Sequence, residues 1–239
     1  MSGMLSGLPK FHRGALALFL LTVAGTALVG DQPLGDALRL QPGALLSGSG
    51  LWQPLTANFV FPVDSVGLIL GSLFMQWFIG SRLEGFWGTR KYVTLVLGCG
   101  FAGYLAYALL SPWLPAVVHG GSTAVDLAAV TAFGVVYGRQ ELSLVGAVTL
   151  RGRTLAMILI ALGVLGPLAR GAPWPLVIPW LVGVAGAYLV TAQPWKRRDA
   201  NGGGGGRGGG GRGGSNRPAK PRERAKPSHL RVVKDSLPN

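Results

Sequence analysis

Long apolar runs separated by short polar connectors fill the first 195 residues of the chain. Six of them lie near residues 14–30, 64–80, 91–111, 120–138, 153–169 and 174–192. Each has about the length, roughly 17 to 25 residues, that a helix needs to cross the hydrocarbon core of a bilayer. The pattern therefore predicts an all-α polytopic membrane protein with six transmembrane helices.

The first run has some features of a cleaved signal peptide. Lys10, His12 and Arg13 precede it, and glycine and alanine lie near its end. Because five further runs follow, we interpret it as an uncleaved first helix.

The basic residues between the runs predict the orientation of the chain. They gather in alternate connectors: Lys10 and Arg13; Arg82, Arg90 and Lys91; Arg139, Arg151 and Arg153; and Lys196, Arg197 and Arg198. The remaining connectors hold only Arg39 and Arg170 as basic residues. By the positive-inside rule, both termini are expected in the cytoplasm.

Composition supports a membrane protein over a soluble one. Hydrophobic residues make up 49% of the 239 residues and charged residues 13%, with a mean hydropathy of +0.41. The net charge of +13 lies mainly in the tail, since residues 196–239 hold twelve Lys or Arg against three Asp or Glu. The single cysteine, Cys99, excludes an internal disulfide and is expected to be a small packing residue.

Residues 196–239 form a glycine-rich basic tail that we expect to be disordered. Arginines among glycines are typical of some RNA-binding segments, but no aromatic residues are interleaved here, so nucleic acid is the disfavoured partner. Attraction to anionic lipid headgroups, or simple solubility, is the preferred interpretation. Docking to a protein partner is the alternative.

Two connectors have sequences that indicate more than a simple link between helices. Residues 31–63 are too rich in Leu, Trp and Phe for a free linker, and we expect them to lie partly in the membrane surface with Trp52 and Phe59 as anchors. The connector GSRLEGFWGTRKY puts Glu84 between Arg82 and Arg90. We expect a structural cap here, in which the acid between two basic residues ties the ends of adjacent helices.

Three pieces of the sequence resemble the rhomboid superfamily of intramembrane serine proteases and their inactive relatives. They are LWQPLTANFVF at 51–61, GSRLEGFWGTRKY at 80–92 and GGST at 120–123. The resemblance spans about residues 10–195 and implies a six-helix rhomboid-like bundle with Ser122 at the nucleophile position. The other positions that it matches are Trp52, Gly80, Leu83, Glu84, Gly88, Gly120, Gly121 and Gly183.

The departures from the family pattern concern the catalytic groups. Active members carry a histidine on the sixth span, three residues before the position of Gly183, and Trp180 stands there. Ser72 stands where active members usually have an oxyanion-binding asparagine, Leu68 where they have a histidine, and Thr123 replaces the second glycine of their motif. The resemblance therefore implies a catalytically inactive member.

Two residues near Ser122 are alternative bases. A serine hydroxyl needs a base to take its proton at neutral pH. His119 lies three residues earlier, where we expect a solvated or capping histidine at the outer surface. Asp126 lies one helical turn after Ser122 on the same face, and we expect its carboxyl to hydrogen-bond Ser122, Thr123 or a neighbouring helix.

Pairs of small residues at helical spacing predict close helix packing in lipid. These are Gly98 with Ala102, Gly100 with Gly103, Gly120 with Ala124, and Gly183 with Ala187. On this interpretation Ser122 lies at a helix crossing.

The sequence thus predicts a cytoplasmic N-terminus at 1–13, a rhomboid-like membrane domain at 14–195 and the tail at 196–239. The expected function is a pseudoprotease that binds transmembrane segments of client proteins in the lipid bilayer and influences their trafficking or turnover. The alternatives are an active protease that uses Ser122 with a non-standard base, and a small-solute transporter, for which Asp126 alone is thin support. No metal site or cofactor is expected, since the chain has no metal-ligand cluster or nucleotide fingerprint.

Overall fold

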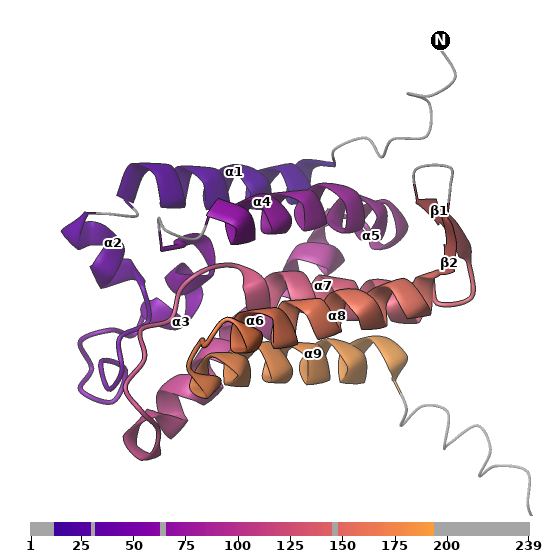
Figure 1. Ribbon diagram of the computed structural model, residues 1–239. Coiled ribbons are helices and arrows are strands. Elements are labelled where there is room, and N and C mark those ends of the chain that lie inside the picture. Colours follow the sequence, from indigo (N-terminus) through magenta and orange to yellow (C-terminus); the bar gives the residue numbers. More distant parts are fainter. Residues whose placement is uncertain (1–11, 30–31, 63–65, 145–147, 194–239) are drawn as a thin grey trace, which may run out of the picture.

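A computed structural model describes residues 12–29, 32–62, 66–144 and 148–193, and these are mostly helical. The long helices are α1 (Arg13–Val29), α4 (Val66–Met75), α6 (Thr89–Leu110), α7 (Thr123–Val136), α8 (Gly152–Ala169) and α9 (Val177–Ala192). They run roughly along one another in a bundle (Figure 1). The predicted apolar runs coincide with these helices to within a few residues.

Four helical segments of the described chain are long and apolar enough to cross a membrane. They are Val66–Trp87, Thr89–Trp113, Gly152–Ala169 and Trp174–Ala192. The first joins α4, the π-helical turn η3 (Gln76–Gly80) and α5 (Ser81–Trp87), and the last joins the 3-10 turn η5 (Trp174–Leu176) to α9. Helices α1 and α7 are apolar but shorter. The prediction of a multi-pass integral membrane protein is therefore supported, with four spans on length and composition.

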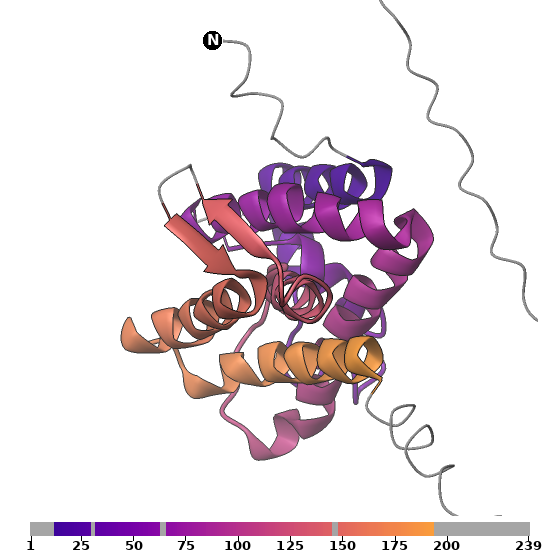
Figure 2. The same cartoon turned by 90° about the vertical axis from the view of Figure 1, so that its right-hand side faces the viewer.

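Helix α7 occupies the centre of the bundle. It packs most extensively against α9 and α8 and also contacts α6, α4 and η3. Viewed nearly along its axis in Figure 2, the rose-coloured helix is surrounded by other helices. Every residue from Ala124 to Phe133 is buried. An apolar helix that is covered on all sides in this way is a core element, so its position fixes that of its neighbours.

Close approach of helix backbones explains several of the small residues. A Cβ at Gly183 of α9 would lie 2.9 Å from the carbonyl oxygen of Ala124 in α7, and one at Gly103 of α6 would collide with the carbonyl group of Pro179 in α9. The predicted close packing is confirmed at these crossings. It is wrong at Gly98, which faces open space.

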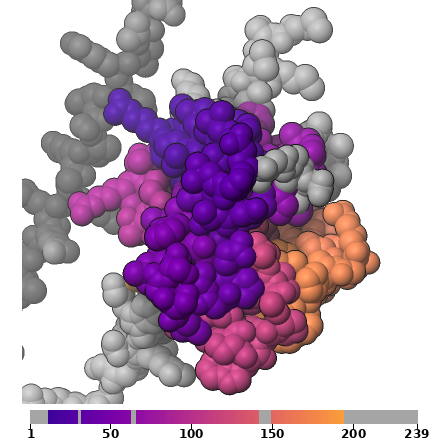
Figure 3. Space-filling model, turned by 90° about the vertical axis from the view of Figure 1, so that its left-hand side faces the viewer, coloured from indigo at the N-terminus to yellow at the C-terminus, as the bar shows by residue number. Residues whose placement is uncertain are grey.

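The segment between α1 and α4 is folded, as its apolar composition indicated. It contains α2 (Pro33–Leu38), α3 (Gln53–Thr56) and the 3-10 turn η1 (Ala57–Phe59). Much of the face shown in Figure 3 is covered by this indigo and violet part of the chain. Trp52 is half exposed and donates its indole N–H to the carbonyl oxygen of Ala37 at 3.1 Å, which leaves its ring free for an interface. Phe59, the other expected anchor, packs instead on the main core cluster.

A β-hairpin not expected from the sequence follows α7. Strand β1 (Glu141–Leu144) pairs antiparallel with β2 (Val148–Arg151), with Glu141 opposite Arg151. The hairpin lies at the end of the bundle opposite α2 and α3 (Figure 1).

Glu84 ties the ends of three helices together. Its carboxylate accepts hydrogen bonds from the backbone N–H groups of Gly14 at 2.8 Å and Ala15 at 2.6 Å, and from the Thr89 hydroxyl at 2.5 Å. The first turn of a helix leaves its N–H groups without intrahelical partners, and its dipole favours a negative charge there. Glu84 therefore caps α1 from a distant segment, and the expected role of this acid in tying helix ends together is confirmed.

The neighbours of Glu84 bring α1, α5 and α6 together. Leu83 is fully buried, and a Cβ at Gly80 would collide with the Tyr92 hydroxyl of α6. Gly88 joins α5 to α6 with φ +80°, a left-handed conformation that favours glycine. The GxxLExxxG pattern thus has a structural explanation at each of its four positions.

Glu84→Ala is expected to lower the free energy of unfolding by about 2 to 4 kcal/mol, because it leaves two buried N–H groups and a hydroxyl without their acceptor. Denaturant unfolding of the detergent-solubilised protein, followed by tryptophan fluorescence, measures the change. The matched control, Glu141→Ala, removes an exposed carboxylate and should have little effect. Equal effects of the two substitutions would contradict the capping role.

Candidate functional site

Ser122 is held at the start of α7 by a glycine loop. Gly121 has φ +102°, and a Cβ there would lie 2.5 Å from the ring of Phe61, so only glycine fits. Its N–H donates to the carbonyl oxygen of Ala57 at 2.8 Å, and its own carbonyl oxygen accepts a 2.6 Å hydrogen bond from the Tyr104 hydroxyl. Ser122 follows directly as the N-cap residue of α7 and is 1% exposed.

The Ser122 side chain belongs to a buried polar cluster. Its hydroxyl donates to Asp126 Oδ2 at 2.9 Å and is hydrogen-bonded to the Ser72 hydroxyl. Gln76 Nε2 lies 3.4 Å from the Ser122 hydroxyl, 3.5 Å from Asp126 Oδ1 and 3.3 Å from the Thr22 hydroxyl. We call Thr22, Ser72, Gln76, Ser122 and Asp126 the Ser122 cluster. It joins α1, the α4–η3 segment and α7.

The sequence predicted only part of this cluster. The expected contact between Asp126 and Ser122 is confirmed, and Ser72 lies beside Ser122, where the resemblance implied an oxyanion group. Gln76 was missed. The signal that could have found it is its spacing, since Ser72 and Gln76 are polar residues one helical turn apart in an apolar run, as are Ser122 and Asp126.

Trp180, at the position where the resemblance implied a histidine, packs against apolar side chains. Its side chain is 7% exposed and lies in a cluster with Ala124 and Leu127 of α7 and Val177 of α9. An indole has only a donor N–H and cannot take a proton from serine. Neither His12 nor His119, the two histidines in the described part of the chain, is hydrogen-bonded to Ser122.

His119 is buried, which corrects the expectation of a solvated histidine. It is 1% exposed, and its ring lies 3.8 Å from that of Tyr107 between centroids. Nδ1 lies 2.8 Å from the Val117 carbonyl oxygen and Nε2 3.3 Å from that of Pro175, while its backbone pairs with Leu40. His119 therefore joins three connectors on the side of the bundle that holds α2 and α3.

The geometry of the Ser122 cluster limits its chemistry. Its five residues are at most 6% exposed, so a polypeptide carbonyl cannot reach Ser122 unless neighbouring helices move. In the described chain, the partners of the Asp126 carboxyl are neutral hydroxyl and amide groups. Asp126 lies on the same helix as Ser122 and lacks the orienting third group that activated nucleophiles use. The arrangement is suited to holding helices together.

One polar atom of the cluster lacks a partner. Gln76 Oε1 is buried and accepts no hydrogen bond from the described residues. Gly120, next to the cluster, packs against the carbonyl oxygen of Val60, which leaves no room for a side chain. No group of three or more His, Cys, Asp or Glu among the described residues could hold a metal ion.

Replacing Asp126 tests what holds the cluster together. Asp126→Asn keeps the shape of the side chain and one acceptor oxygen, so the free energy of unfolding should change by less than about 1 kcal/mol. Asp126→Leu leaves the donors of Ser122 and Gln76 without an acceptor, so it should lower the free energy of unfolding by about 1 to 3 kcal/mol. Thermal unfolding in detergent measures both. Thr131→Val, which removes a hydroxyl bonded to its own helix, is the control. A larger loss in the asparagine variant than in the leucine variant would contradict this account.

The pH dependence of stability tests the burial of His119. Burial lowers the pKa of this imidazole below its ordinary value of 6.5, against the opposing effect of the Val117 and Pro175 carbonyl groups. The unfolded chain therefore binds a proton at a pH where the folded chain does not, and this contribution destabilises the fold progressively as pH falls through about 6.5. His119→Gln should flatten the slope of stability between about pH 7.5 and 5.5. Equal slopes in His119→Gln and the unmodified protein would refute the assignment.

The comparisons with known proteins add no identification to this geometry. The local chemistry of the site is a serine bonded to a carboxyl within a closed cluster, and Trp180 packs in a neighbouring apolar cluster. No protein-family model matches the chain, and no curated protein matches it.

Proposed function

We propose that the chain is a rhomboid-like pseudoprotease that binds transmembrane segments of client proteins and influences their trafficking or turnover. The observation that carries the proposal is the state of Ser122. Its hydroxyl is bonded within a closed cluster, and Trp180, which stands at the sequence position where the resemblance implies a histidine, packs against apolar side chains. A rhomboid-like scaffold without a working nucleophile retains its membrane-embedded surfaces for binding.

The proposal includes six spans and cytoplasmic termini. Helix α1 is a 17-residue apolar helix, and α7 is shorter but is covered by protein, so it need not match the bilayer thickness alone. With α1 and α7 added to the four longer segments, the basic connectors at residues 82–91 and 139–153 fall on one side of the membrane. The positive-inside rule assigns that side to the cytoplasm.

Helices α4 and α8 offer the surface for a client. Both contact α7 but scarcely contact each other. Ser72 is the only buried residue of α4, and the buried residues of α8 all lie in its first two turns. Leu70 of α4 and Leu162 of α8 are each more than three-fifths exposed. In lipid, a client helix can replace acyl chains along such faces at little cost.

Photo-crosslinkers at Leu70 and Leu162 should capture a shared set of membrane proteins in cells. A crosslinker at Leu20, an exposed residue of α1, serves as the lipid-facing control and should not capture that set. Mass spectrometry of the adducts gives the comparison. No adducts at all, or the same adducts from all three positions, would count against client binding along α4 and α8.

Fluorophosphonate labelling separates the pseudoprotease from an active protease. The purified protein in bilayers should remain unlabelled while an active rhomboid reacts, because Ser122 lacks an activating base and general-base assistance contributes about 10²- to 10⁴-fold. Labelling that disappears in Ser122→Ala would overturn the proposal in favour of a protease, with Asp126 as the first candidate base.

A further inference from the structure

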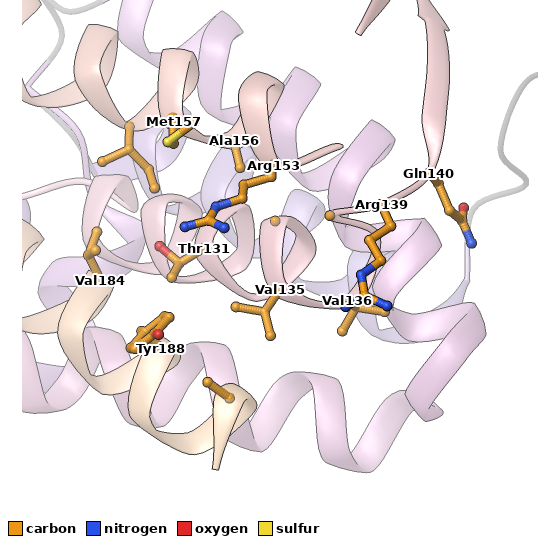
Figure 4. A pocket seen from close by; sticks show the side chains of 14 residues that line it. Thr131, Val135, Val136, Arg139, Gln140, Arg153, Ala156, Met157, Val184 and Tyr188 are labelled. Carbon is orange, nitrogen blue, oxygen red and sulfur yellow. The ribbon is translucent and has the colours of Figure 1, made fainter. Parts of the chain in front are cut away.

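A groove opens where α8 and α9 diverge over α7. The two helices share an apolar cluster around Trp180, but away from it they separate and leave a hollow of about 780 Å³. Its walls come from Thr131 and Val135 of α7, Met157 of α8, and Val184 and Tyr188 of α9 (Figure 4). The volume lies within the range of about 300 to 1,000 Å³ typical of small-molecule sites.

Two arginines lie at the groove. Arg153, in the first turn of α8, points into it toward Thr131, and Arg139, just beyond α7, lies near Val136 (Figure 4). Neither guanidinium makes an ion pair or a side-chain hydrogen bond with the described residues. Arginine normally satisfies its planar array of donors with carboxylates, phosphates or carbonyl oxygens. Both arginines are exposed, so their guanidinium donors are available to an anionic partner from outside the described chain.

The surroundings of the two arginines are basic. They also line an adjoining hollow of about 520 Å³, together with Arg151, Thr154 and one acid, Glu141. Three guanidinium groups against one carboxylate give this end of the groove a net positive charge. An acidic ligand group is attracted here, whereas the glycine-rich tail of this chain, with twelve Lys or Arg and three Asp or Glu, is repelled.

The groove is amphipathic in the same sense as a membrane lipid. Its arginine end lies near the β-hairpin, at a helix terminus that the proposed orientation places at the level of the lipid headgroups, and its valine, methionine and tyrosine walls run toward the middle of the bundle. Basic pockets between transmembrane helices are suited to anionic headgroups, and guanidinium groups bind phosphate in a bidentate manner. A free phosphate would use only the arginines and leave the apolar walls uncovered.

We propose that this groove binds an anionic glycerophospholipid, with Arg139 and Arg153 on the headgroup phosphate and an acyl chain along Val135, Met157 and Val184. The site is separate from the Ser122 cluster and does not depend on the proposed client binding. Its occupant is a lipid of the leaflet that faces the hairpin end of the bundle.

Native mass spectrometry of the full chain tests the proposal, with detergent micelles that contain equal amounts of phosphatidylglycerol and phosphatidylcholine. The unmodified protein should retain phosphatidylglycerol preferentially. Arg139→Gln combined with Arg153→Gln should weaken that retention about tenfold or more, because charge-assisted hydrogen bonds are lost. Arg170→Gln, which removes an exposed arginine at the other end of α8, should leave it unchanged. Equal retention by the double variant and the unmodified protein would overturn the proposal.

A second variant distinguishes a lipid from free phosphate. Met157→Trp adds bulk to the groove wall without changing its charge, and Met157 is half exposed, so the fold should accept it. It should reduce phosphatidylglycerol retention severalfold. If retention persists in this variant and millimolar inorganic phosphate displaces the lipid, the arginines form a phosphate site and the acyl-chain part of the proposal fails.

Discussion

The close contact between α7 and α9 is the constraint on which the rest of the structure depends. Gly183 lies against the carbonyl group of Ala124, so the two backbones approach as closely as small residues allow. This contact fixes the position of α7 in the bundle. It thereby also fixes the position of Ser122, the residue at the start of that helix. It also fixes where a side chain of α9 can reach, and Trp180, one turn earlier, packs into that interface.

The two sides of α7 consequently differ in chemistry. Toward α9 its neighbours are apolar, whereas toward α1 and α4 its first turns meet the hydroxyl and amide groups of the Ser122 cluster. Polar groups in an apolar interior must find their partners within the protein, and those of this cluster largely do so across three helices. Glu84 follows the same rule at the other end of α1, where a buried carboxylate takes the free N–H groups of the first turn. Helix α1 is thereby held by polar contacts at both places.

Features that depend on the local sequence pattern were predicted well. Apolar run length located the long helices, and the i, i+4 spacing of Ser122 and Asp126 predicted their hydrogen bond, because both follow from helix geometry alone. Prediction failed where the partner is distant in the chain. Glu84 was expected to tie helix ends together, but its partners could not be named, because they are backbone groups some seventy residues away and no periodicity reports such a contact. The burial of His119 depends likewise on Tyr107 of α6 and on Leu40 and Pro175, which belong to two separate connectors.

The attachment of α8 connects the two proposed binding surfaces. Its buried residues, Gly152, Leu155 and Ala156, all lie near the hairpin, and there Ala156 meets Gly134 of α7 so closely that a Cβ on Gly134 would lie 2.6 Å from it. A phospholipid between Arg153 and α9 would occupy this anchored end of α8. A client helix would contact the opposite end, where Leu162 and Leu165 are exposed. A helix held at one end can adjust at the other without losing its main packing, so lipid and client can occupy the same helix without competing for the same residues.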